Sequence, residues 1–200
     1  MNITEEEISC ASSLVEIDEL VAKCERCSLY ATKTKDVFGV GNKTAEVMFI
    51  GEAPGKSEDE QGEPFVGAAG KFLNEMLIGI DLKREDVYIS NVLKHRPPLN
   101  RDPLPDEAEA CWPYLKRQIE LINPKLVVFL GRHALNRVFP NQLISKVHGN
   151  AFRTEVWGRK QTFLALYHPA AALYNGGMRA TLVADFNKIP KIIEKINKEN

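Results

Sequence analysis

The sequence predicts a three-layer α/β/α sandwich, in which helices cover both faces of a central, mostly parallel four-stranded sheet. Short runs of consecutive apolar residues alternate with longer segments of helical periodicity, and most of the runs end in Gly, Pro or polar residues. Continuous apolar runs are typical of parallel strands that are covered on both faces. The length of 200 residues suits a single domain over residues 1–200.

Four apolar runs rich in Val, Ile, Leu or Phe are the predicted strands, and four amphipathic segments are the predicted helices. The strands span Glu46–Ile50, Val87–Ile89, Leu126–Leu130 and Thr162–Leu166. The helices span Ala68–Ile80, Pro105–Ile122, His133–Phe139 and Met178–Ile196. We expect Asp106 to cap the second helix and Pro190 to kink or interrupt the last one.

Composition and charge exclude several classes of protein. Hydrophobic residues make up 44% and charged residues 26%, which argues against disorder. The net charge of −1 gives no support to a DNA partner, but local charge clusters can still provide one. No signal peptide or bilayer-spanning stretch is recognisable, so we expect a cytoplasmic protein without a membrane partner.

Distinctive motifs follow the predicted strands, at the sheet edge where α/β folds bind ligands. Residues 51–55 (GEAPG) follow the first strand, and their glycines permit a sharp turn close to a ligand. Glu52 is then expected to point into the crevice, although a solvated Glu in an ordinary loop explains this pentapeptide equally well.

Three more side chains suit a flat, polar ligand. Phe65 lies among small residues in the segment 64–70 (PFVGAAG) and could stack on a base, or be a core Phe beside a helix start. Asn91 ends the second strand and offers a donor and an acceptor, or simply closes a turn. His168 follows the last strand, extended because Pro169 comes next. Each is ordinary alone, but their recurrence at successive strand ends indicates one site.

Three cysteines and a histidine form a candidate metal centre. Cys24 and Cys27 make a C-x-x-C pair, Cys111 lies in the second predicted helix, and His95 precedes that helix. Such a set could hold zinc or an iron–sulfur cluster. A thioredoxin-like redox pair is disfavoured because no strand directly precedes Cys24. Cys10 is left over, and we expect a free buried thiol there rather than a substitute ligand.

Together these motifs are similar to those of family 4 uracil-DNA glycosylases, members of the uracil-DNA glycosylase superfamily. The matching segments are collinear and span most of the chain. They are C-x-x-C at 24–27, GEAPG at 51–55, PFVGAAG at 64–70, DVYISNVLKHRPPLNRDPLPDEAEAC at 86–111, INPKLVVFLG at 122–131 and HPAA at 168–171.

The resemblance implies a monomeric enzyme that hydrolyses the N-glycosidic bond of uracil in single- or double-stranded DNA, leaving an abasic site. Glu52 matches the family's acidic residue that positions or activates water, and His168 matches the histidine that hydrogen-bonds uracil O2 as charge develops there. The implied base-binding residues include Phe65, which stacks on the uracil, and Asn91, which reads its edge; the set is Gly51, Ala53, Phe65 and Asn91.

The resemblance also implies a 4Fe–4S cluster bound by the segments 24–27 and 95–111. Its ligands would be Cys24, Cys27, His95 and Cys111. The basic residues Lys94, Arg96 and Arg101 are expected to contact DNA phosphates, and Leu173 to act as a wedge that helps to extrude the base.

Two departures from the family pattern matter. His95 replaces a usual Cys, as in the related UdgX group, which binds uracil-DNA covalently through a different histidine on a longer loop. The exchange removes a negative charge and should raise the cluster's reduction potential, as His ligation does in Rieske centres. The present loop is short and carries Asn100 and Arg101, so we predict hydrolytic turnover. Ala170, where Ser is common, should matter little.

Two alternatives stay open at this point. One is a uracil-DNA binding protein that forms a tight or covalent complex without turnover. The other is a zinc-stabilised nucleotide-binding or redox protein.

Overall fold

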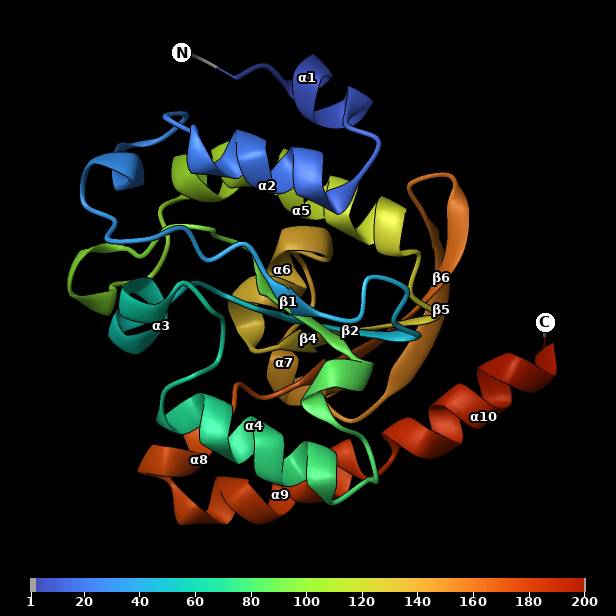
Figure 1. Ribbon diagram of the computed structural model, residues 1–200. Coiled ribbons are helices and arrows are strands. Elements are labelled where there is room, and N and C mark those ends of the chain that lie inside the picture. Colours follow the sequence, from blue (N-terminus) through green and yellow to red (C-terminus); the bar gives the residue numbers. More distant parts are fainter. Residues whose placement is uncertain (1–2, 200) are drawn as a thin grey trace.

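A mixed sheet runs through the centre of the computed structural model, which describes residues 3–199 (Figure 1). The strand order is β1-β3-β2-β4-β6-β5. The strands are β1 (Val40–Gly41), β2 (Val47–Gly51), β3 (Tyr88–Asn91), β4 (Leu126–Leu130), β5 (Ala151–Val156) and β6 (Arg159–Leu166). The inner strands β3, β2, β4 and β6 pair in parallel, which confirms the predicted parallel core of the sheet.

The sheet has six strands rather than the four predicted, because an antiparallel strand pairs at each edge. β1 is only two residues long, too short to carry a recognisable pattern. No residue of β5 is buried, so this strand lacks the apolar run that marks the inner strands. It joins β6 through a tight hairpin turn in which Trp157 and Gly158 both have positive φ.

Helices cover both faces of the sheet, as predicted (Figure 1). They are α1 (Glu5–Cys10), α2 (Leu14–Ala22), α3 (Lys56–Gln61), α4 (Ala68–Ile78), α5 (Pro105–Ile122), α6 (Arg132–Val138), α7 (Ile144–Val147), α8 (Ala171–Tyr174), α9 (Gly176–Phe186) and α10 (Ile189–Glu199). Short 3₁₀ turns lie at Ser28–Ala31, Arg84–Asp86 and Pro98–Asn100.

The interruption expected near Pro190 is confirmed, because the C-terminal segment forms two helices, α9 and α10, which are separated at Asn187 and Lys188. Pro190 is the second residue of α10, where its missing N–H costs no hydrogen bond. Asp106 is not the cap of α5 but lies in its first turn, where the Glu107 carboxylate accepts a hydrogen bond from the N–H of Leu104.

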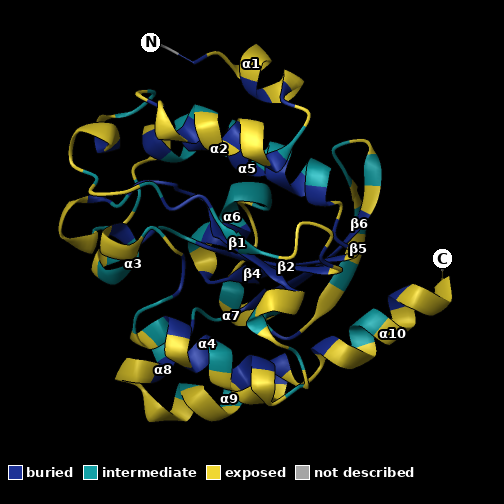
Figure 2. Cartoon of the chain, viewed as in Figure 1, coloured by how far each residue is buried: buried dark blue, intermediate teal, exposed yellow. Residues whose placement is uncertain are grey.

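Each face of the sheet has its own apolar core, because successive strand residues point to opposite sides. Met48 and Phe129 face the layer of α1, α2 and α5, whereas Phe49 and Leu130 face the layer of α4, α9 and α10. Figure 2 shows the strands buried and the helices exposed on their outer surfaces. Within residues 3–199, no helix combines the length and apolarity that crossing a membrane requires.

Candidate functional site

The carboxyl ends of the parallel strands meet along one cleft of about 640 Å³. In the sheet register Gly51 is paired with Asn91, so the residues that follow β2 and β3 start side by side. Most of the side chains that the sequence singled out line this cleft. They are Glu52, Ala53, Phe65, Asn91, Arg101, His168 and Leu173. The expected convergence of motifs from separate strand ends is therefore present.

Gly51 does not line the cleft, but its missing side chain allows Asn91 and Phe65 to lie close together there. A Cβ at this position would stand 2.4 Å from Asn91 Oδ1 and 2.6 Å from the Phe65 ring. Such distances are well inside van der Waals contact, so no side chain fits there without moving both neighbours. The glycine is required by this close approach.

Phe65 is held in a left-handed backbone conformation, with φ of 54°. The Glu58 carboxylate accepts hydrogen bonds from the N–H groups of Val66 and Gly67, at 3.0 and 2.8 Å. The Phe65 ring stacks on the His168 ring, with centroids 5.6 Å apart. A strained conformation fixed by a carboxylate presents the aromatic ring to the cleft. Sequence reasoning missed Glu58, whose only signal was an acidic residue in a polar stretch.

Asn91 is only 2% exposed, and its Oδ1 atom has no hydrogen-bond partner among residues 3–199. Leaving a buried acceptor unpaired costs roughly 1–3 kcal/mol. An acceptor of this kind at the wall of a cleft indicates that a ligand supplies the missing donor.

His168 is neutral in the folded protein. Burial lowers its pKa to about 4, and its Nδ1 accepts a hydrogen bond from the N–H of Ala170 at 3.1 Å. With Nδ1 as acceptor, the proton of the neutral ring lies on Nε2. Gly131, with φ of +97°, leaves room for the ring, because a Cβ there would lie 3.1 Å from His168 Cβ. The site therefore offers an uncharged N–H donor.

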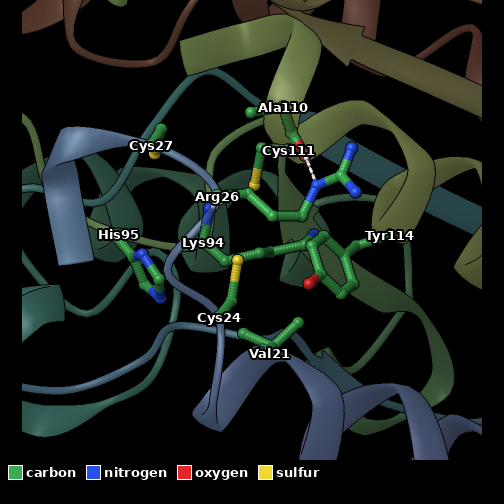
Figure 3. Close-up of a pocket in the computed structure, with 9 residues that line it drawn as sticks. All are labelled: Val21, Cys24, Arg26, Cys27, Lys94, His95, Ala110, Cys111 and Tyr114. Carbon is green, nitrogen blue, oxygen red and sulfur yellow. Dashed lines mark hydrogen bonds between the residues drawn. The ribbon is translucent and has the colours of Figure 1, made fainter. Parts of the chain in front are cut away.

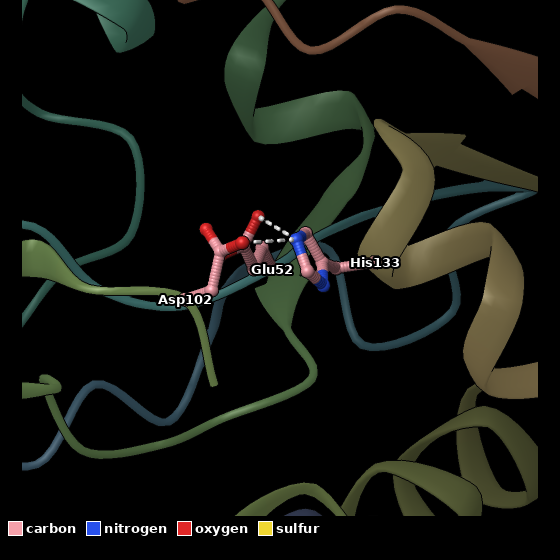
Figure 4. Close-up of side chains that lie close together, drawn as sticks. All are labelled: Glu52, Asp102 and His133. Carbon is pink, nitrogen blue, oxygen red and sulfur yellow. Dashed lines mark ion pairs between the residues drawn. The ribbon is translucent and has the colours of Figure 1, made fainter. Parts of the chain in front are cut away.

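Glu52 belongs to a small electrostatic network (Figure 4). The Nε2 atom of His133 lies 3.7 Å from Glu52 Oε2 and 3.3 Å from Asp102 Oδ2. Burial raises the pKa of Glu52, and the charge of His133 opposes that rise. Asp102 is 63% exposed and forms an ion pair with Arg132, which indicates a charge network more than a metal site. His133 was predicted only as the start of a helix.

The candidate metal ligands surround a separate hollow between α2, α5 and the loop after β3 (Figure 3). Cys24 follows α2, Cys111 lies in α5, and both are buried. Burial raises the pKa of Cys111 to about 12 and also raises that of Cys27. The hydroxyl of Tyr114 lines the same hollow and interacts with the Cys24 thiol, and burial raises the pKa of Tyr114. Cys10, expected to be buried, is exposed at the end of the short helix α1.

The expectation that Lys94 contacts DNA phosphates is wrong. Its side chain is 1% exposed, and its Nζ donates to Ser90 Oγ, to the carbonyl of Asn91 and to Gln118 Oε1. Burial lowers its pKa to about 7. The tightly packed polar groups of β3 and α5 draw this lysine inwards, so it is not available to a phosphate.

Of the other expected DNA contacts, Arg101 and Leu173 line the cleft, and Arg96 lies on the same loop as Arg101. Arg96 donates to Asn100 Oδ1 at 2.7 Å, and Arg101 makes two hydrogen bonds to the buried carboxylate of Glu107. Leu173 is 45% exposed at the rim. The loop that carries both arginines is thus held in a fixed conformation.

Comparison with known proteins identifies relatives along nearly the whole chain. A family model described as the uracil DNA glycosylase superfamily matches residues 38–195. A type-4 uracil-DNA glycosylase of Archaeoglobus fulgidus is 51% identical, over 92% of this chain and 94% of that protein. One of Sulfurisphaera tokodaii is 48% identical, over 90% and 84%. One of Thermotoga maritima is 40% identical, over 90% and 94%.

Proposed function

The chain belongs to the uracil-DNA glycosylase superfamily, and from that membership we propose how its cleft removes uracil from DNA. It is a uracil-DNA glycosylase of DNA repair, with relatives of that name at 40% to 51% identity over most of the chain. The reaction hydrolyses the bond between the sugar and uracil N1, and uracil departs as an anion. The residue roles below are our proposal.

The unpaired Oδ1 atom of Asn91 carries the proposal. Uracil presents an N3–H donor beside its O4 acceptor, and an amide side chain offers the complementary acceptor and donor. Cytosine has the opposite pattern at these atoms, so it would leave Asn91 unpaired. Phe65 supplies the surface on which the extruded base stacks, worth roughly 1–3 kcal/mol. Ala53 lines the slot around the base, and Gly51 lets Asn91 and Phe65 approach each other because it has no side chain.

His168 stabilises the departing base. A neutral imidazole with its proton on Nε2 donates to uracil O2 as negative charge develops there. Such a positioned donor contributes about 3–4 kcal/mol to transition-state stabilisation. Its lowered pKa keeps the ring from becoming a cation at neutral pH, so the donor needs no proton from solution.

Glu52 acts on the sugar, from which the uracil departs. Its carboxylate stabilises the positive charge that develops on the sugar, and it orients the attacking water. The neighbouring His133 favours the ionised carboxylate, which this role requires. Asn100 and Arg101 line the cleft from the loop where a covalently binding relative would carry its reactive histidine. This arrangement supports turnover over covalent trapping.

The metal centre fits an iron–sulfur cluster, which we propose is 4Fe–4S with Cys24, Cys27, His95 and Cys111 as ligands. A tetrahedral zinc site holds its donor atoms within about 4 Å of one another. Among residues 3–199, no three donor atoms of this set lie within 4.8 Å of one another. The hydroxyl of Tyr114 lies at the wall of the hollow, where it interacts with the sulfur of the proposed ligand Cys24. Once bound, the cluster would cross-link the N-terminal segment to the loop after β3 and to α5.

The DNA partner is single- or double-stranded and contains uracil. Arg96 and Arg101 flank the cleft and can contact phosphates, and Leu173 at the rim can fill the space of the extruded base. One chain carries every proposed group, so we propose that the enzyme acts as a monomer. We also propose that it acts inside the cell, on the cell's DNA.

An excision assay tests this function. The holoenzyme is incubated with an end-labelled oligonucleotide that contains one uracil, and alkali then cleaves abasic sites before a denaturing gel. Wild type should cleave uracil- but not cytosine-containing strands, and Asn91→Ala should lose most of this activity. A slow-migrating protein–DNA adduct would support covalent binding instead, and an intact strand with wild type would refute the proposal.

A further inference from the structure

His95 is the only nitrogen donor in the proposed set of iron ligands, and an imidazole has two nitrogens that could bind. We propose that Asp36 fixes His95 in the tautomer that binds iron through Nδ1, so that Asp36, His95 and the metal form a carboxylate–histidine–metal triad. The inference rests on the iron–sulfur centre proposed above, and it assigns Asp36 as a positioning residue of that centre.

The side chain of His95 has one engaged and one unengaged nitrogen. Its Nε2 lies 2.8 Å from Asp36 Oδ1, whereas its Nδ1 makes no hydrogen bond to any group in residues 3–199. His95 is 4% exposed and lines the hollow, but Asp36 does not line it. The carboxylate therefore binds Nε2 from outside the hollow, and Nδ1 is the nitrogen that remains available to a metal.

A competing donor could reverse this assignment. Lys33 Nζ lies 3.4 Å from His95 Nε2, and an ammonium can only donate, which would force the proton onto Nδ1. The carboxylate contact is much shorter, and Lys33 already forms an ion pair with the same Asp36 oxygen. Asp36 therefore decides the tautomer: Nε2 donates to it, and the lone pair remains on Nδ1.

The backbone places both partners before any metal binds. The N–H of Val37 donates to the carbonyl of Lys94 at 2.8 Å, so the residues next to Asp36 and His95 are joined directly. On the other side, the N–H of Lys94 donates to Cys111 Sγ at 3.3 Å. His95 thus lies between a fixed carboxylate and a fixed thiol.

Metal-bound histidines commonly donate their second N–H to a carboxylate, and loss of that partner typically weakens metal binding about 10–100-fold. A thiolate ligand needs no tautomer control. Asp36→Ala should therefore speed iron release to a chelator about 10–100-fold in the natural protein. The same substitution should have little effect in a His95→Cys background.

The test uses purified holoenzyme in four forms: wild type, Asp36→Ala, His95→Cys and the double variant. Iron release is followed by visible absorption, and circular dichroism verifies the fold of each form. Pulsed EPR of the reduced cluster, with and without ¹⁵N-histidine, should detect one strongly coupled nitrogen in wild type and none after His95→Cys. Lys33→Met should keep the coupled nitrogen.

Two results would overturn the triad and leave the glycosylase assignment intact. One is a wild-type cluster without a coupled nitrogen. The other is equal acceleration of iron release by Asp36→Ala in both backgrounds, which would mean that Asp36 only supports the local fold. Purified protein that holds no iron would remove the triad together with the proposed cofactor, whereas uracil excision is measured separately.

Discussion

The proposed base-binding cleft and the proposed metal hollow lie close together in space. They differ in the kind of structure that positions their side chains. The cleft's groups follow β2, β3 and β6, whose register is fixed by backbone hydrogen bonds. The hollow's groups come mostly from irregular segments, namely residues 24–27 and the loop after β3, with α5 and the end of α2 as its regular walls. The sheet therefore sets the geometry of the cleft before a ligand arrives, whereas the parts of the hollow would be joined by the proposed cluster.

Removing the donor of the cleft should have the largest effect. His168→Ala is expected to lower the single-turnover excision rate about 10²–10³-fold, because the charge on uracil O2 loses its preorganised partner. His168→Gln keeps an N–H donor of similar reach and should recover part of the rate. Equal rates for the two variants would mean that the ring contributes shape and stacking on Phe65 rather than the hydrogen bond.

Removing the metal tests the other half of the comparison. Chelation should lower the free energy of unfolding, by on the order of 3 kcal/mol for a ligand present at a hundred times its Kd. Limited proteolysis should then cut first within residues 23–38, which the cluster would no longer hold to α5. Cleavage that starts instead in the sheet would contradict the idea that only the hollow depends on metal. Denaturant titration and mass spectrometry of the fragments measure both effects.

A smaller loss is expected when the support of the aromatic wall is removed. Glu58→Ala leaves the N–H groups of Val66 and Gly67 without their acceptor, at a cost of roughly 1–3 kcal/mol. Part of that cost should appear as a raised KM for uracil-containing DNA, because Phe65 is no longer fixed. Glu60→Ala, an exposed change on the same helix, should leave KM unchanged.

The smallest effect concerns pH. The role proposed for Glu52 requires its ionised form, so the excision rate should fall as pH drops through the raised pKa of this group. His133→Phe removes a positive neighbour that lowers this pKa, so the midpoint of the pH–rate profile should move to higher pH, by less than about one unit. Protonation of His168 lies lower, near pH 4, and does not set this midpoint. An unmoved midpoint would show that burial, Asp102 and Arg132 set the pKa of Glu52 without His133.

The parallel core of the sheet and the main cleft residues could both be predicted from the apolar runs in the sequence. An apolar run identifies a buried strand, and the residue after it must lie at the sheet edge, which places Glu52, Asn91 and His168 together. The edge strands β1 and β5 escaped because pairing there requires no apolar run. Their pairing is decided by the neighbouring strand rather than by their own composition.

Side-chain partners far apart in the sequence could not be predicted. A lysine beside two arginines looks like a basic surface, yet Gln118 and Ser90 draw Lys94 into the interior. The sequence marks His133 only as a helix residue, whereas the structure places it beside Asp102, which comes from a distant loop. Tertiary contacts decide these roles, and no local pattern records them.

Lys94 connects the cleft and the hollow directly through its hydrogen bonds. Its ammonium holds the carbonyl of Asn91, while its own backbone N–H holds the Cys111 sulfur. Gln118 lines neither region but accepts a hydrogen bond from that ammonium. Genetic variation at position 118 should therefore behave like a defect in uracil recognition and in cofactor retention at once, although the residue touches neither uracil nor iron.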